Sequence, residues 1–175
     1  MPVDFGVALK ALSGAGARFV VVGGLAVLMQ GGKYFTEDLD IAFERTRDNA
    51  KRIASALRQF EPRPRGFPPD VPFIFDEQAI LLSQVLTLST TIGDIDLLGE
   101  VSGIGTFREI VAQADDADYM GIPIKVLSVD ALITAKTAAN RPKDQPGLEA
   151  LKALRAARAE LAREEHGTDQ AAGRV

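Results

Sequence analysis

The sequence predicts an α+β fold with a helical extension at the C-terminus. Short β-branched runs alternate with segments whose apolar residues recur at helical spacing, and glycine or proline separates them. The chain has 175 residues, of which 46% are hydrophobic, so it fits one domain with one core. We expect residues 1–145 to form this domain, and residues 146–175 to form a C-terminal helix and tail packed on it.

The N-terminal part begins with a helix, a strand and a second helix. Apolar residues in 4–12 share one helical face, which predicts a helix. The run 18–22 is rich in valine between two turn signals and predicts a buried strand. Gly23 and Gly24 follow this strand at once, and residues 25–30 then predict the second helix.

The rest of the chain continues the alternation. Further strands are predicted over 39–43, 84–90, 92–98 and 123–127. Further helices are predicted over 47–60, 107–114, 129–139 (with Ser128 as N-cap) and 148–165. Residues 61–72 hold five prolines within twelve residues and predict an exposed loop without regular structure. Residues 167–175 predict a frayed tail.

The composition excludes several classes of protein. Cysteine is absent, which removes disulfides and thiolate chemistry, and the single histidine, His166, argues against a zinc site. The net charge of -4 argues against a protein that coats nucleic acid nonspecifically. No apolar run approaches the roughly 18–20 residues of a membrane span, and the N-terminus does not resemble a signal peptide. We therefore expect a cytoplasmic protein without a membrane partner.

Two aspartates lie two residues apart at the start of a predicted strand. In a strand such residues point to the same face, so Asp38 and Asp40 place two carboxylates side by side. Their repulsion favours a cation between them, and Mg²⁺ prefers oxygen ligands of this kind. The alternative interpretation is a solvated strand end with two surface acids.

A strand, two glycines and a helix follow one another directly at Gly23 and Gly24. Glycine lets a ligand approach the backbone, and a helix start offers free N–H groups to an anion, which together outline a phosphate-binding turn. A plain strand-to-helix turn remains the alternative. Only one short helix and a turn separate the glycines from Asp38, so a triphosphate on the glycines would reach a metal on the carboxylates.

A second aspartate pair, Asp94 and Asp96, has the same strand spacing. If its strand lies beside the first, it adds a third carboxylate, and three carboxylates can hold two metal ions. We choose Asp96 because it enters the apolar pair Leu97 and Leu98, where an unpaired charge is costly. Asp94 lies nearer the turn, where water solvates it.

A predicted apolar helix ends in a group of cations, Lys136, Arg141 and Lys143. Cations at a helix C-terminus are favoured by the helix dipole alone. If they face the three carboxylates, they can instead bind a triphosphate.

Taken together, these segments resemble the DNA polymerase β-like nucleotidyltransferase superfamily. The resemblance rests on Val-Gly-Gly at 22–24, Thr-Glu-Asp-Leu-Asp at 36–40 and Asp-Ile-Asp-Leu-Leu at 94–98. The segment 130–144, with its Lys and its Arg-Pro-Lys-Asp, is similar to the branch that contains AbiEii-type toxins. The resemblance covers about residues 18–154 and implies a minimal nucleotidyltransferase fold, a mixed twisted sheet flanked by helices.

The resemblance also implies roles for the first group of residues. Gly23 and Gly24 would shape the triphosphate turn. Asp38 and Asp40 would bind Mg²⁺, with Mn²⁺ as an alternative, and Asp96 would complete the metal set and serve as base for the incoming hydroxyl.

The same resemblance implies roles for the cations and the remaining polar residues. Lys136 would contact the nucleotide or the developing charge, and Asp144 would occupy the position of the late acidic residue. Thr36 matches a hydroxyl that a cognate antitoxin kinase modifies in some relatives. Relatives often carry an arginine two residues before that threonine, where this chain has Tyr34, and Lys33 beside it is the substitute cation.

The implied function is Mg²⁺-dependent transfer of a nucleoside monophosphate from an NTP to a hydroxyl acceptor. The resemblance suggests the 3′ end of an RNA such as tRNA as acceptor, a toxin role and a cognate antitoxin protein as partner. Arginines and lysines suited to RNA are Arg63, Arg65, Lys136, Arg141, Lys143, Lys152, Arg155 and Arg158. Two alternatives stay open: a catalytically silent interaction protein or antitoxin partner, and an unrelated α/β protein whose acids bind a structural cation.

Overall fold

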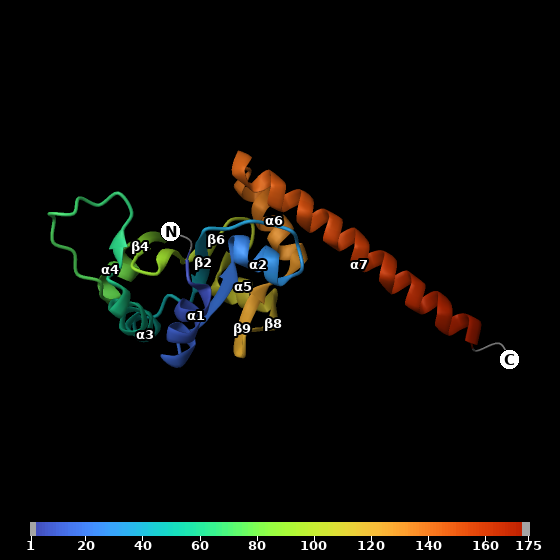
Figure 1. The fold of residues 1–175 in the computed structure, drawn as a ribbon, viewed down its shortest axis with the longest axis horizontal. Helices are drawn as coiled ribbons and strands as arrows, with labels where there is room; N and C mark the ends of the chain where they lie inside the picture. The colour runs from blue at the N-terminus through green and yellow to red at the C-terminus, as the bar shows by residue number, and fades with distance from the viewer. Residues whose placement is uncertain (1–2, 173–175) are drawn as a thin grey trace.

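The computed structural model describes residues 3–172, with side chains described up to residue 164, as nine strands, seven α-helices and two short 3₁₀ helices (Figure 1). The strands are β1 Phe19–Val22, β2 Asp38–Phe43, β3 Arg63–Pro64, β4 Val85–Thr90, β5 Gly93–Leu98, β6 Glu100–Val101, β7 Gly105–Thr106, β8 Ala114–Tyr119 and β9 Ile122–Leu127. The helices are α1 Phe5–Gly14, α2 Gly23–Met29, α3 Arg47–Leu57, η1 Arg58–Phe60, α4 Glu77–Leu82, α5 Phe107–Ala112, α6 Val129–Ala139, η2 Pro142–Asp144 and α7 Gln145–Ala172.

Seven strands form one mixed sheet in the order β3-β4-β5-β2-β1-β9-β8. The pairs β2–β5 and β1–β9 are parallel, and the remaining neighbours are antiparallel. The prediction of an α+β fold with a mixed sheet flanked by helices is therefore confirmed. Strands β6 and β7 form a separate two-stranded hairpin that the sequence did not predict.

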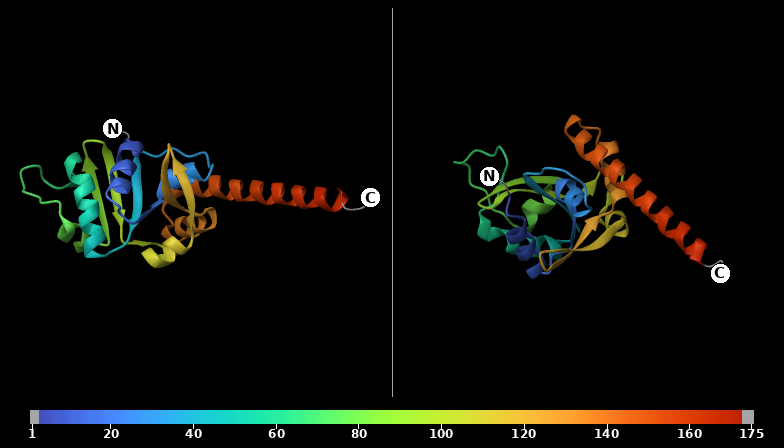
Figure 2. Two further views of the ribbon diagram at one scale, coloured as in Figure 1. Left: turned by 90° about the horizontal axis from the view of Figure 1, so that it is seen from below. Right: turned by 45° about the vertical axis from the view of Figure 1, so that its right-hand side comes forward.

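Alternation along β2 and β5 separates a buried face from a polar one. Leu39, Ile41, Ile95 and Leu97 point to the same face because paired residues share a side, and all four are fully buried. The aspartates of both strands occupy the opposite face. Helices α1 and α3 lie side by side, as Figure 2 shows in its left view.

The long helix α7 packs on the body along its first half and then projects away from it (Figures 1 and 2). Leu148 and Leu151 are buried there. The predicted C-terminal helix is confirmed, but the predicted frayed tail is wrong for residues 167–172, because the helix continues to Ala172, and residues 173–175 lie outside the described part. Within the described part, no helix is long and apolar enough to cross a membrane.

The proline-rich segment contains a two-residue strand, which corrects the prediction of a loop without regular structure. Arg63 and Pro64 pair with Ser89 and Leu88 of β4. Proline is tolerated here because β3 is the edge of the sheet, where one side of the strand needs no N–H donor.

Two longer elements, helix α4 and strand β8, were also missed. Helix α4 follows the proline-rich segment, and Asp76 caps it by accepting a hydrogen bond from the Ala79 N–H at 2.9 Å. Strand β8 has the sequence Ala-Asp-Asp-Ala-Asp-Tyr, which lacks apolar alternation. It forms as the opposite edge of the sheet, where charged side chains face water and discourage pairing with other chains.

Buried Asn49 joins α3 to the ends of β1 and β2. Its Oδ1 accepts the N–H of Arg18 at 2.7 Å, and its Nδ2 donates to the carbonyls of Arg18 and Glu44, each at 2.9 Å. These bonds pair the Arg18 N–H and the Glu44 carbonyl and add to the bond that the Arg18 carbonyl accepts from the Glu44 N–H at 3.3 Å.

We predict that Asn49→Ala lowers the free energy of unfolding by about 2–4 kcal/mol, because the Arg18 N–H and the Glu44 carbonyl lose the partner that Asn49 gives them. Urea denaturation followed by circular dichroism measures this change. The control Gln78→Ala removes an exposed amide on α4 and should change stability by no more than about 0.5 kcal/mol. Equal effects of the two substitutions would contradict the assignment.

Candidate active site

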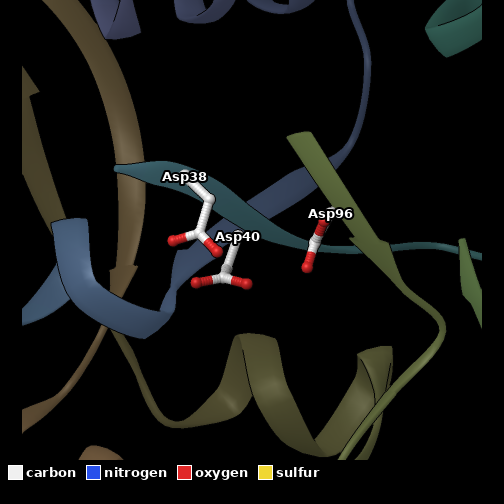
Figure 3. A group of neighbouring side chains, drawn as sticks. All are labelled: Asp38, Asp40 and Asp96. Carbon is white, nitrogen blue, oxygen red and sulfur yellow. The ribbon is translucent and has the colours of Figure 1, made fainter. Parts of the chain in front are cut away.

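Three carboxylates converge on the polar face of the sheet, as Figure 3 shows. The parallel register of β2 and β5 places Asp40 opposite Asp96, while Asp38 precedes Asp40 on the same face. One carboxylate oxygen from each of the three residues lies within 4.8 Å of the others. The structure thus brings together the three residues that the sequence predicted as metal ligands.

The choice of Asp96 over Asp94 also agrees with the structure. Both residues lie on the polar face of β5, but the Asp94 side chain is 40% exposed and the Asp96 side chain is 16% exposed. Asp94 pairs with Asp38 across the strands, yet it lies outside the group of three carboxylates. Asp96, which lies opposite Asp40, joins the cluster.

The two glycines permit the close approach of three chain segments. Gly23 has a positive φ of 63°, and a Cβ at this position would collide with the carboxylate of Asp40. A Cβ on Gly24 would lie 2.5 Å from the side chain of Thr36. Glycine is therefore required at both positions for steric reasons. The structure also shows that the glycines form the first turn of α2 and do not precede it.

Asp40 has a raised pKa. Burial and then the charge of Asp38 raise its pKa from the ordinary 3.8 to about 6, while Lys143, Lys136 and Arg141 act in the opposite direction. A buried carboxylate beside a like charge has a free-energy cost that a bound cation removes. The electrostatics of Asp40 therefore favour cation binding.

The segment before β2 alternates between the site and the solvent. Tyr34, Thr36 and Asp38 are partly buried, whereas Lys33 and the residues that lie between these three are exposed. Thr36 Oγ1 donates to Asp38 Oδ1 at 3.1 Å, so the hydroxyl orients the first metal ligand. Lys33 makes no ion pair among the described residues, and the structure does not bring it to the carboxylates.

Lys136 and Asp144 form a buried ion pair next to the cluster. Only 8% of the Lys136 side chain and 4% of the Asp144 side chain are exposed, and Nζ lies 3.2 Å from Oδ1. Arg141 contacts both oxygens of the same carboxylate, at 2.6 and 3.2 Å. Burial alone would raise the pKa of Asp144, but the bonds from Arg141 and Lys136 overcome it and hold the pKa below its ordinary value.

The Tyr34 ring lies against the lysine of this ion pair. Lys136 Nζ lies 5.2 Å from the ring centroid, a cation–π arrangement. Burial, followed by the charges of Asp144, Asp38 and Asp40, raises the pKa of the Tyr34 hydroxyl, which therefore stays protonated.

Gly147 makes room for this contact. A Cβ there would lie 3.0 Å from the Tyr34 ring and 3.1 Å from Lys136 Cε. Sequence reasoning missed Gly147, although a glycine in the first turns of a long helix is unfavourable and is a signal of close packing.

Most of the arginines and lysines that we predicted to bind RNA form ion pairs or hydrogen bonds within the protein instead. Arg155 pairs with Asp130 at 3.4 Å, and Arg158 donates to the Gln30 carbonyl at 2.6 Å, so both fasten α7 to the body. Lys143 is exposed and lowers the pKa of Asp40 through its charge.

Arg65 is a residue of the site that the sequence assigned only to RNA. Its guanidinium forms an ion pair with Asp96, and Nη1 lies 3.6 Å from Asp94 Oδ2. Arg65 lies two residues after Arg63 on a proline-rich segment. Nothing in this local sequence predicts contact with an aspartate on another strand.

The residues present fit a divalent cation such as Mg²⁺ or Mn²⁺. The donor set consists of carboxylate oxygens, which hard cations prefer, and the glycine at 23 leaves space that a Cβ would fill. Buried Lys136 is near enough to lower the pKa of Asp40 through its charge, so anionic ligands of the cation would meet positive charge.

The fold matches those of solved nucleotidyltransferases. The lincosamide antibiotic adenylyltransferase LnuA, solved with lincomycin bound, gives a TM-score of 0.59 at 15% identity, covering 88% of this chain and 99% of that one. The crystal structure of ANT(2'')-Ia with adenylyl-2''-tobramycin gives 0.53 at 13% identity, covering 94% and 95% of the two chains. No protein-family model matches the chain, and no curated protein sequence matches it significantly. At these identities the likeness establishes the fold, which is the predicted nucleotidyltransferase fold.

We predict that Asp40→Asn removes a pH dependence of stability. Because the pKa of Asp40 is raised from 3.8 to about 6, the folded protein binds more protons than the unfolded chain between these values. The free energy of unfolding of the metal-free protein therefore falls as pH rises through this window, by at most about 3 kcal/mol from Asp40.

Urea denaturation in EDTA at pH 4.5 and 7.5 measures this difference. Wild type should lose more stability than Asp40→Asn on going to pH 7.5, and the exposed control Asp70→Asn should behave like wild type. The same pH dependence in all three proteins would show that Asp40 ionises without cost.

Proposed function

We propose that this chain is a metal-dependent nucleotidyltransferase that transfers a nucleoside monophosphate from an NTP to a hydroxyl acceptor. One observation carries the proposal: on a nucleotidyltransferase fold, the carboxylates of Asp38, Asp40 and Asp96 converge next to a two-glycine turn. In the reaction, the acceptor oxygen forms a bond to the α-phosphorus, and the bond from that phosphorus to pyrophosphate breaks.

The three aspartates would hold Mg²⁺ or Mn²⁺, which neutralises charge on the phosphates when bound. Thr36 orients Asp38 through its hydroxyl hydrogen bond, and Gly23 allows Asp40 to lie against the turn. We assign the proton of the acceptor hydroxyl to Asp96, the role that the family resemblance implies. Gly24 likewise allows the Thr36 side chain to lie against the turn, where a Cβ would be only 2.5 Å from it.

We propose that Lys136 stabilises negative charge on the nucleotide and that Arg141 and Lys143 add to the positive field. Asp144 uses both carboxylate oxygens in ion pairs with Lys136 and Arg141. We therefore assign Asp144 a positioning role toward Lys136, without contact to the substrate. Lys33 remains a candidate for nucleotide binding only if the segment that carries it turns inward.

For the acceptor we propose an RNA 3′ end, such as that of tRNA, and a toxin role in the AbiEii-type branch with a cognate antitoxin. This part rests on the sequence resemblance at residues 130–144. The solved relatives are named for adenylylation of antibiotics, so small hydroxyl compounds belong in the same assay, and ATP is the first nucleotide to test. We further propose a cytoplasmic location and a nucleotidyltransferase domain over residues 1–145, extended by 146–175.

The second candidate is a catalytically silent nucleotidyltransferase-like protein. Tyr34 favours it, because an aromatic ring stands where relatives often carry an arginine and covers Lys136 at 5.2 Å. In that case the site binds nucleotide without transferring it.

An assay with α-labelled NTPs, total RNA and Mg²⁺ tests the proposal. We expect wild type to label RNA, Asp38→Asn to give no detectable product, and Lys136→Met to lose about 100-fold or more in rate. Asp70→Asn, an exposed carboxylate on the proline-rich loop, is the matched control and should label like wild type.

Three results separate the candidates. Product on a small hydroxyl compound in place of RNA would keep the enzyme and replace the acceptor. No product with any of the four NTPs, together with tight nucleotide binding in calorimetry, would identify the silent protein. Absence of both labelling and nucleotide binding would leave a structural cation site.

A further inference from the structure

Arg65 lies on the same row of the sheet as two of the clustered aspartates. The paired residues across β4, β5 and β2 are Thr87, Asp96 and Asp40. Arg65 extends this row by one strand, because it follows β3 directly and its N–H donates to the Thr87 carbonyl at 2.9 Å. Neighbouring strands are about 4.8 Å apart, so the long arginine side chain spans the Thr87 position to reach Asp96.

This order decides the side from which Arg65 meets its partner. Strand β5 lies between β4 and β2, so Asp40 flanks Asp96 on one side and Arg65 approaches from the other. The Asp96 carboxylate therefore stands between a fixed guanidinium and the two remaining aspartates. A metal bound by the three aspartates would lie on the side of Asp96 away from the guanidinium.

The backbone that carries Arg65 is held firmly. Arg63 donates to the carbonyls of Pro68 at 2.9 Å and Val71 at 2.7 Å, which closes the loop on itself. Pro62 and Pro64 restrict φ on the N-terminal side. A long side chain that starts from a restrained backbone loses less freedom when it forms an ion pair.

The geometry points to Arg65 as a positioning residue for the metal site, and this inference rests on the proposed function. Without a partner, Asp96 is repelled by Asp38 and Asp40 and rotates toward solvent. The ion pair with Arg65 holds its carboxylate in place, so the third ligand is oriented before metal enters. Partners of this kind behind a ligating carboxylate typically change metal affinity by about 10–100-fold.

The opposite arrangement has a distinct consequence. If the guanidinium occupied the place of the metal, removing it would free Asp96 and strengthen metal binding. The sign of the change in affinity therefore distinguishes orientation from competition.

Mn²⁺ binding to the full chain, followed by the electron paramagnetic resonance signal of free Mn²⁺, tests the inference without any assay of catalysis. We expect Arg65→Gln to weaken Mn²⁺ affinity about 10–100-fold, and Arg65→Lys to weaken it less because it keeps the charge. Arg52→Gln removes an arginine that pairs with Asp48 at 2.8 Å on α3 and should leave affinity unchanged. Thermal unfolding shows whether each variant is folded. If Arg65→Gln does not fold, the Mn²⁺ affinity of Arg65→Lys tests the inference.

Unchanged or tighter binding in the Arg65 variants, with normal binding in wild type, would overturn the positioning role and leave the proposed function standing. No Mn²⁺ binding by wild type would overturn both.

Discussion

The candidate site depends on the parallel register between β2 and β5. This register sets Asp40 against Asp96, and the antiparallel pairing of β1 with β2 brings the end of β1, and so Gly23, next to Asp40. A shift of one residue in β5 would turn Leu97 toward the polar face and Asp96 into the core, where an unpaired carboxylate is costly. The apolar residues that alternate with the aspartates therefore secure the register as well as the core.

That register brings three carboxylates together, and the surrounding cations offset their mutual repulsion only in part. Burial and Asp38 raise the pKa of Asp40 to about 6. Arg65 neutralises the Asp96 side, whereas Lys136 is already paired with Asp144. The cluster thus keeps negative charge in a partly buried place, which is the condition under which a divalent cation binds. Tyr34 precedes Thr36 in the chain, so its cation–π contact couples the position of Lys136 to the segment that orients Asp38.

The sequence predicted most of the central sheet and the three aspartates, because alternation and spacing are local signals. It placed the β4–β5 hairpin correctly and chose Asp96 over Asp94 from the apolar run that follows. It missed β8, whose acidic residues suit an edge strand but show no apolar pattern. It also missed the contact of Arg65 with Asp96, which depends on how an edge strand aligns with its neighbours. The sequence also failed to place Lys33. This residue is exposed because it lies in a segment without regular structure, in which exposed and partly buried side chains alternate.

The central claim is that these three aspartates form one cation site. A crystal of the protein soaked in Mn²⁺, measured near the manganese absorption edge, tests it most directly. We predict an anomalous peak in contact with carboxylate oxygens of Asp38, Asp40 and Asp96, at roughly the 2.0–2.2 Å typical of such ligands. Anomalous peaks only at other sites, with the three carboxylates bound solely to protein groups, would contradict the account.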